Sequence, residues 1–128
     1  MRAAKLTPGD TIRPANWSAS IAGGTSAASV NALGVLSLTG DGTNQARADQ
    51  AVVTKPGRRY RLGIAASGNS ADVSIGTTSG GSEISTATYA AGYREIDFVA
   101  TAATTYFRVA RTLVGAVTVT NLSLRLVG

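Results

Sequence analysis

The stretch Arg59-Tyr60-Arg61-Leu62-Gly63-Ile64-Ala65-Ala66 decides the fold class of this chain, because polar and apolar side chains alternate along it. Successive side chains of a β-strand point to opposite faces of the sheet. The alternation therefore places Tyr60, Leu62 and Ile64 on one buried face and the two arginines on the other. One apolar and one charged face are typical of an antiparallel sheet that covers a core on one side only.

Short runs of the same kind recur on both sides of this stretch, and turn clusters separate them. Helical periodicity is hard to find in any of them. Strands are predicted for residues 17–21, 34–39, 47–53, 59–66, 71–76, 84–88, 94–98, 106–111 and 116–127. Residues 23–28 are predicted as a loop. About eight or nine short, evenly spaced strands without a helix predict an antiparallel all-β sandwich or barrel.

The last predicted strand, residues 116–127, changes phase part of the way along. Its apolar residues stand at odd positions up to Val119 and at even positions from Leu122 onward. A strand with a period of two cannot turn both sets toward the core unless one residue is inserted. We therefore predict a bulge or bend at Thr120-Asn121.

The chain of 128 residues is long enough for one domain with one core, and no repeat or linker divides it. We predict a single domain over 1–128, in which residues 1–16 form an extended N-terminal segment that contacts a neighbouring subunit. Cysteine is absent, so no disulfide or thiolate metal site can form. No stretch is apolar enough for a transmembrane span, and the N-terminus lacks the apolar run of a secretory signal. We expect no membrane partner.

The charge balance is basic, with 12 Lys and Arg against 7 Asp and Glu and a net charge of +5. Most of the basic residues are arginine, which pairs with carboxylates and tolerates partial burial, so it suits protein interfaces. The predicted partner interface consists of Arg58, Arg59, Arg61, Arg94, Arg108, Arg111 and Arg125. No specific nucleic acid is expected, because Tyr60 points away from its neighbouring arginines and offers no stacking platform beside them.

Catalytic chemistry is largely missing from the sequence. The chain has no histidine, the commonest general base and metal ligand, and we predict a protein that is not an enzyme and binds no cofactor or metal. Glu95 and Asp97 share one strand face, but paired or solvated carboxylates explain this better than a glycosidase pair. The segment 41–44, Asp-Gly-Thr-Asn, is predicted as a turn rather than a calcium loop. The Gly-rich segment 76–81 is predicted as a hairpin tip rather than a phosphate loop.

Lys55-Pro56-Gly57-Arg58-Arg59-Tyr60-Arg61-Leu62 follows the apolar strand Ala51-Val52-Val53. This Pro-Gly-x-x-Tyr-x-Leu pattern resembles jelly-roll carbohydrate-binding modules, in which the tyrosine begins an inward-facing strand. Segments similar to further strands of these modules follow in the same order at 72–77, 93–98 and 119–124, and Trp17 matches an N-terminal tryptophan. The resemblance covers about Trp17 to Leu126 and implies a jelly-roll β-sandwich. Modules of this kind are common in bacteriophage fibre, tail and head-decoration proteins.

The resemblance implies a non-enzymatic bacteriophage virion structural protein, a capsid decoration/head or tail accessory protein assembled in the host cytoplasm. Its implied partners are other virion proteins and further copies of itself in a homo-oligomer. The alternative is a carbohydrate- or host-surface-binding module, which would need exposed aromatic rings for sugar faces to stack on. Trp17 and Tyr60 match core positions, so the glycan-binding candidates are Tyr89, Tyr93 and Tyr106.

Overall fold

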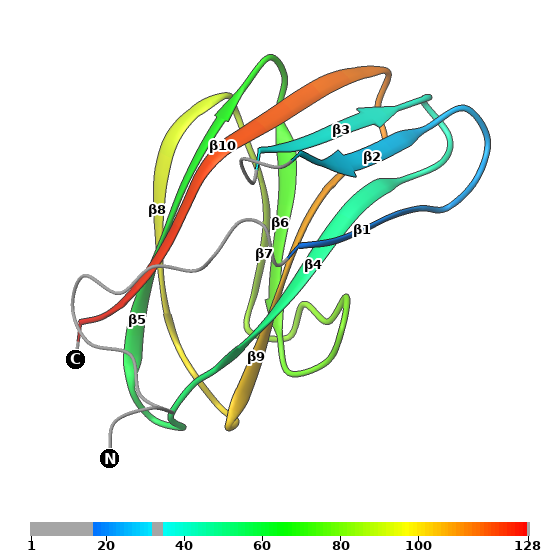
Figure 1. The fold of residues 1–128 in the computed structure, drawn as a ribbon. Coiled ribbons are helices and arrows are strands. Elements are labelled where there is room, and N and C mark those ends of the chain that lie inside the picture. The colour runs from blue at the N-terminus through cyan, green and yellow to red at the C-terminus, as the bar shows by residue number, and fades with distance from the viewer. Residues whose placement is uncertain (1–16, 32–34, 128) are drawn as a thin grey trace.

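The structure, a computed structural model, describes residues 17–31 and 35–127. These residues form ten strands in two five-stranded antiparallel sheets that pack against each other as a sandwich (Figure 1). The predicted all-β sandwich is confirmed. The predicted N-terminal segment, residues 1–16, lies outside the described residues. In the described ranges, no helix is long and apolar enough to cross a membrane.

The two sheets each interleave strands from distant parts of the sequence. The first sheet has the order β1 (Ser18–Ile21), β4 (Ala46–Val53), β9 (Thr104–Arg111), β6 (Ala71–Gly76) and β7 (Ser85–Tyr89). The second has the order β2 (Ala27–Val30), β3 (Leu36–Gly40), β10 (Gly115–Leu126), β5 (Arg59–Ser67) and β8 (Gly92–Val99). Most neighbours in a sheet are therefore far apart in the chain, so side chains that share a surface are mostly non-local.

The core lies between the two sheets and contains three of the seven aromatic residues of the chain as one cluster. The rings of Tyr60 and Phe98, from the second sheet, stack with their centroids 5.8 Å apart. Phe107, from the first sheet, meets Phe98 edge-on, with the ring centroids 5.6 Å apart. Such pairs add about 0.5–1.5 kcal/mol to the burial of their area. The cluster therefore joins the two sheets.

The alternation predicted for β5 is confirmed, because Tyr60, Leu62 and Ile64 are buried while Arg59 is exposed and Arg61 is half-buried. The predicted bulge in β10 is confirmed as well. Val119 pairs with Ala66 and Asn121 with Ala65, so Thr120 is the inserted residue. Val119 and Leu124 are both buried on either side of the bulge, whereas the side chain of Leu122 lies outside the described set.

The loop predicted for residues 23–28 is wrong at its C-terminal end, because Ala27 and Ala28 belong to strand β2. Their small side chains carry little intrinsic preference for a strand. The strand forms through its pairing with β3, where Ala28 lies opposite Leu38 and Val30 opposite Leu36. This strand raises the number in the described residues to ten, against the eight or nine predicted.

The carboxylate of Asp41 organises the connection between β3 and β4. Its Oδ1 accepts hydrogen bonds from the backbone N–H groups of Thr43 and Asn44, at 2.9 and 2.7 Å. Its Oδ2 accepts from the backbone N–H of Thr25, in the β1–β2 loop, at 3.0 Å. This is the local bonding by which Asp commonly stabilises a turn, as the sequence predicts for this segment. Asp41 also ties the β1–β2 loop to this turn.

The Asp41 turn makes stability depend on pH. Hydrogen bonds from Asn44 and Thr43 favour the ionised carboxylate and hold the pKa of Asp41 well below its ordinary value of 3.8. The native state therefore binds this proton less readily than the unfolded chain, so the stabilisation is present above pH 4 and is lost on acidification. We expect the Tm difference between the wild type and D41N to shrink as the pH is lowered from 6 to 2.5. A difference that stays constant over this range would contradict the assignment.

Candidate functional site

A bidentate ion pair stands on the outer face of the first sheet, where β4 and β9 pair. Asp49 lies directly opposite Arg108 in the antiparallel register. The guanidinium donates from Nε to Oδ1 at 2.5 Å and from Nη2 to Oδ2 at 2.8 Å. Both side chains are largely buried, although they belong to the outer face. Such planar two-point pairing fixes the orientation of both groups.

The β6–β7 loop lies directly against this ion pair. The hydroxyl of Ser79 donates to Oδ2 of Asp49 at 3.1 Å. Gly80 has a φ of +78°, and a Cβ at this position would come within 2.8 Å of the guanidinium of Arg108. Only glycine combines this conformation with this close approach. The predicted hairpin tip is thus held over the sheet by the Asp49–Arg108 pair.

A cavity of about 240 Å³ that opens to solvent lies between the loop and the sheet. It is lined by Ser18, Asp49, Gln50, Ala51, Ser79 and Tyr106. Tyr106 lies opposite Ala51 on β4 and opposite Gly76 on β6. Both neighbours are small, and Tyr106, which is half-buried, borders the cavity. The cavity therefore combines an aromatic face with a carboxylate and serine hydroxyls, a set that suits a ligand rich in hydroxyl groups.

The ion pair with Arg108 determines the protonation state of Asp49 in the cavity. Burial raises the pKa of Asp49, but the hydrogen bonds and charge of Arg108 outweigh it, and the pKa lies below its ordinary value. The hydrogen bond to Asp49 in turn raises the pKa of Arg108. At neutral pH the cavity contains an ionised carboxylate that can accept hydrogen bonds but cannot act as a general acid.

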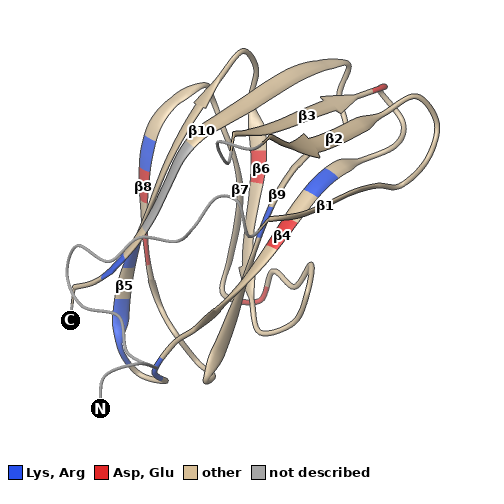
Figure 2. Cartoon of the chain, in the orientation of Figure 1, with Lys and Arg blue, Asp and Glu red and all other residues tan. Residues whose placement is uncertain are grey.

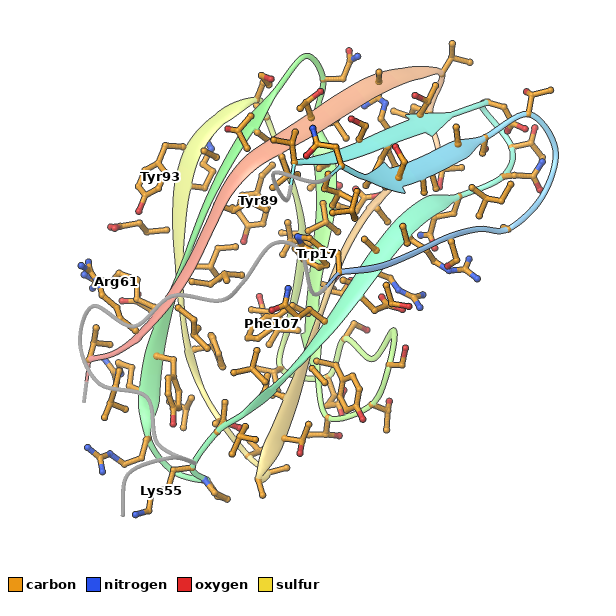
Figure 3. All side chains as sticks on the ribbon, in the orientation of Figure 1. Trp17, Lys55, Arg61, Tyr89, Tyr93 and Phe107 are labelled. Carbon is orange, nitrogen blue, oxygen red and sulfur yellow. The ribbon has the colours of Figure 1, made fainter. Side chains whose placement is uncertain are left out.

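The three glycan-binding candidates do not share one surface. Tyr106 lines the cavity on the outer face of the first sheet. Tyr93 is 58 % exposed on the second sheet, where its hydroxyl donates to Glu95 at 3.0 Å. Tyr89 ends β7 and packs against the core from the sandwich edge. Figure 3 shows Tyr93 on the same side of the molecule as Arg61, away from the centrally placed Tyr89.

The predicted arginine interface is also divided by the fold. Arg59 and Arg61 on β5 and Arg125 on β10 lie on the outer face of the second sheet, and Arg58 lies in the turn that leads into β5. Arg94 is exposed on β8, but alternation with Glu95 directs it away from that face. Arg108 and Arg111 belong to β9 of the first sheet.

Arg111 has a purely internal role in the described structure. Its side chain is 7 % exposed and donates to the backbone oxygens of Ser70, Val114 and Gly115, at 2.8, 2.7 and 3.1 Å. No carboxylate among the described residues pairs with it. It therefore ties the β5–β6 loop to the β9–β10 turn, and we do not carry it into a partner interface. The sequence indicates this inward orientation, because Arg111 follows Phe107 and Val109 at every second position and so lies on the same buried face of β9.

The acidic residues of the described ranges are all engaged within the chain. Asp97 pairs with Arg61 at 2.7 Å, and Glu95 with Arg125 at 3.5 Å, so the predicted Arg-paired carboxylates are observed. The remaining ones accept hydrogen bonds from side chains of the chain: Asp41 from Asn44, Asp49 from Arg108, Asp72 from Thr88 and Glu83 from Thr77. No group of three His, Cys, Asp or Glu residues within 17–31 and 35–127 could hold a metal ion.

The fold resembles solved structures that share little sequence with this chain. The enzymatically active domain of tailspike protein 4 from bacteriophage CBA120 matches 89 % of the chain, with a TM-score of 0.66 and 17 % identity. The chain spans only 20 % of that tailspike chain. No protein-family model matches the chain, and no curated protein matches it in sequence.

Two carbohydrate-binding modules match over nearly their whole length. The module TmCBM61, solved in complex with β-1,4-galactotriose, covers 87 % of this chain and is itself covered to 88 %, with a TM-score of 0.58 and 11 % identity. The module BiXyn10A CBM1 covers 93 % and is covered to 98 %, with a TM-score of 0.59 and 14 % identity. The chain thus has the jelly-roll β-sandwich fold of carbohydrate-binding modules, as the resemblance implied. At these identities the likeness concerns the fold alone.

Proposed function

We propose that this chain is a non-enzymatic structural protein of a bacteriophage virion, a capsid decoration/head or tail accessory protein that binds neighbouring virion subunits. The observation that carries the proposal is the match of 89 % of the chain to part of a phage tailspike, with a TM-score of 0.66. The two carbohydrate-binding modules that match over nearly their whole length have TM-scores below 0.60. In this proposal the protein is located in the virion.

The residue composition and the internal contacts of the carboxylates support a binding role without catalysis. The chain contains no histidine, and its described carboxylates are engaged by internal donors. Asp49, the acid that lines the cavity, is ionised and held by Arg108. A general acid would need a raised pKa and a free approach to substrate.

The virion role is tested on purified phage particles from the host that carries this gene. Mass spectrometry of particles banded in a density gradient should find the chain at a constant ratio to the major capsid protein. Light scattering of the isolated chain should show the homo-oligomer that the resemblance to phage virion modules implies. A chain that is expressed in the lysate but absent from the particles would contradict the virion role, and a strict monomer would contradict the oligomer.

A second candidate function is binding of a surface carbohydrate, and the cavity beside Tyr106 specifically favours it. The half-buried Tyr106, the ionised Asp49 and the serines Ser18 and Ser79 border one space of about 240 Å³. This is smaller than the roughly 300–1,000 Å³ of pockets that enclose drug-sized ligands. The space therefore suits one or two sugar units of a chain that continues into solvent.

Removal of the tyrosine ring should abolish most of this binding. On a glycan array of host polysaccharides, Y106A is expected to reduce binding at least tenfold, because the sugar loses its stacking surface. Y93A is the matched control, since Tyr93 is exposed on the opposite sheet and outside the cavity. Equal binding by the two variants, or no binding by the wild type to any host glycan, would remove the support for this function.

A further inference from the structure

The outer face of the second sheet gathers three arginines in two adjacent rows across three strands. In one row, Arg61 of β5 lies between Arg125 of β10 and Asp97 of β8. In the next row, Arg59 lies opposite Val99 of β8, and the backbone N–H of Val127 donates to its carbonyl. We call this surface the basic face. Its members are Arg59, Arg61, Arg125, Tyr93, Glu95, Asp97, Val99 and Val127.

Two ion pairs hold part of the basic face in place. Arg61 pairs with Asp97 through two hydrogen bonds of 2.7 and 3.0 Å. Glu95 accepts from Arg125 at 3.5 Å and from the hydroxyl of Tyr93 at 3.0 Å. These exposed pairs contribute little to stability. Their effect is to fix the orientation of two arginines and one tyrosine before any partner arrives, which lowers the entropic cost of binding.

The basic face keeps a surplus of positive charge. Arg59 is exposed and forms no hydrogen bond or ion pair with any side chain in the described ranges. Lys55 and Arg58 lie in the turn that leads directly into β5. Figure 2 shows basic residues, in blue, on β5 and at the turn before it. Even without Arg58, four basic side chains (Lys55, Arg59, Arg61 and Arg125) outnumber the two carboxylates of this region, Glu95 and Asp97. A partner would therefore need to supply acidic groups.

Apolar side chains border the unpaired arginine. Val99 and Val127 are 42 % and 38 % exposed on either side of Arg59, and Tyr93 stands at the other end of the face. Arginine and tyrosine beside apolar contacts are the residues on which protein–protein interfaces depend most. A polyphosphate would gain nothing from the valines, whereas an acidic protein surface can place apolar side chains against them.

We propose that the basic face docks an acidic surface of a protein partner, with Arg59 as the central contact and Val99 and Val127 as its apolar border. This proposal rests on the proposed function in one respect, namely that the partner is a neighbouring virion subunit. A second copy of the same face is a poor partner, because a two-fold contact would bring the surplus positive charges together.

The decisive experiment measures rebinding of the purified chain to phage particles that lack it. R59E should reduce rebinding at least tenfold. R94E is the matched control, because it makes the same charge change on an exposed residue of β8 that points away from the face, and it should rebind within twofold of the wild type. Equal rebinding by R59E and R94E overturns the docking face while leaving the virion role intact.

A second measurement does not depend on the virion role. Fluorescence anisotropy at physiological salt compares a labelled peptide, in which leucines are interspersed among ten glutamates, with a GC-rich DNA duplex of ten base pairs. We expect the peptide to bind the wild type more tightly than the duplex, and R59E to weaken peptide binding at least tenfold while R94E does not. If the wild type fails to rebind particles but shows this peptide pattern, the virion role fails and the docking face stands. Tighter binding of the duplex, or no peptide binding, overturns the face.

Discussion

Replacing Arg111 with methionine is expected to lower the free energy of unfolding by about 3 kcal/mol, since buried acceptors that lose their donor cost roughly 1–3 kcal/mol each. Methionine keeps the unbranched volume of the side chain and removes every donor. The carbonyls of Ser70, Val114 and Gly115 would then lose the guanidinium that joins them. Urea denaturation monitored by far-UV circular dichroism would measure the change.

Two further substitutions distinguish the effect of the hydrogen bonds of Arg111 from the effect of its positive charge. R111K keeps the charge but cannot reach both loops from one planar fork, so we expect an intermediate loss of stability. R94M removes an exposed arginine and should change stability by less than about 0.5 kcal/mol. A loss below about 1 kcal/mol for R111M would show that solvent, and not the guanidinium, satisfies these carbonyls.

The second large effect is expected at the aromatic cluster. Phe107→Ala should destabilise the protein by about 3–5 kcal/mol, the usual range for removing a buried phenylalanine. Phe107 is 1 % exposed and is the cluster's only member from the first sheet among the described residues. Its removal would leave a cavity between the sheets and break the edge-on contact with Phe98.

The matched variant for this prediction is Phe107→Leu, which fills most of the volume and should cost about 1.5 kcal/mol or less. Thermal and urea unfolding of both variants would measure the difference. If the alanine variant has a stability within about 1 kcal/mol of the leucine variant, the sheets close over the space and the cluster is not what joins them.

The predicted arginine interface, which the fold divides between the two sheets, shows what strand alternation can and cannot predict. Alternation predicted correctly that Arg59 and Arg61 lie opposite the core-facing residues of β5. It could not show that Arg125 joins them, because the register of β10 on β5 pairs Arg125 with Arg61, 64 positions away in the sequence. The candidate tyrosines were separated by the same cause, since neighbouring positions in sequence came to lie in different sheets.

The sequence by itself determined the all-β class, the buried face of β5 and the bulge at Thr120, because a strand's period of two makes each of these a local property. It also excluded histidine and cysteine chemistry. Only the tertiary structure brought Asp49 to Arg108 and Ser79, opened the cavity beside Tyr106 and assembled the basic face. Those features depend on which strands pair and in what register, which is decided by the packing of two whole sheets around one core.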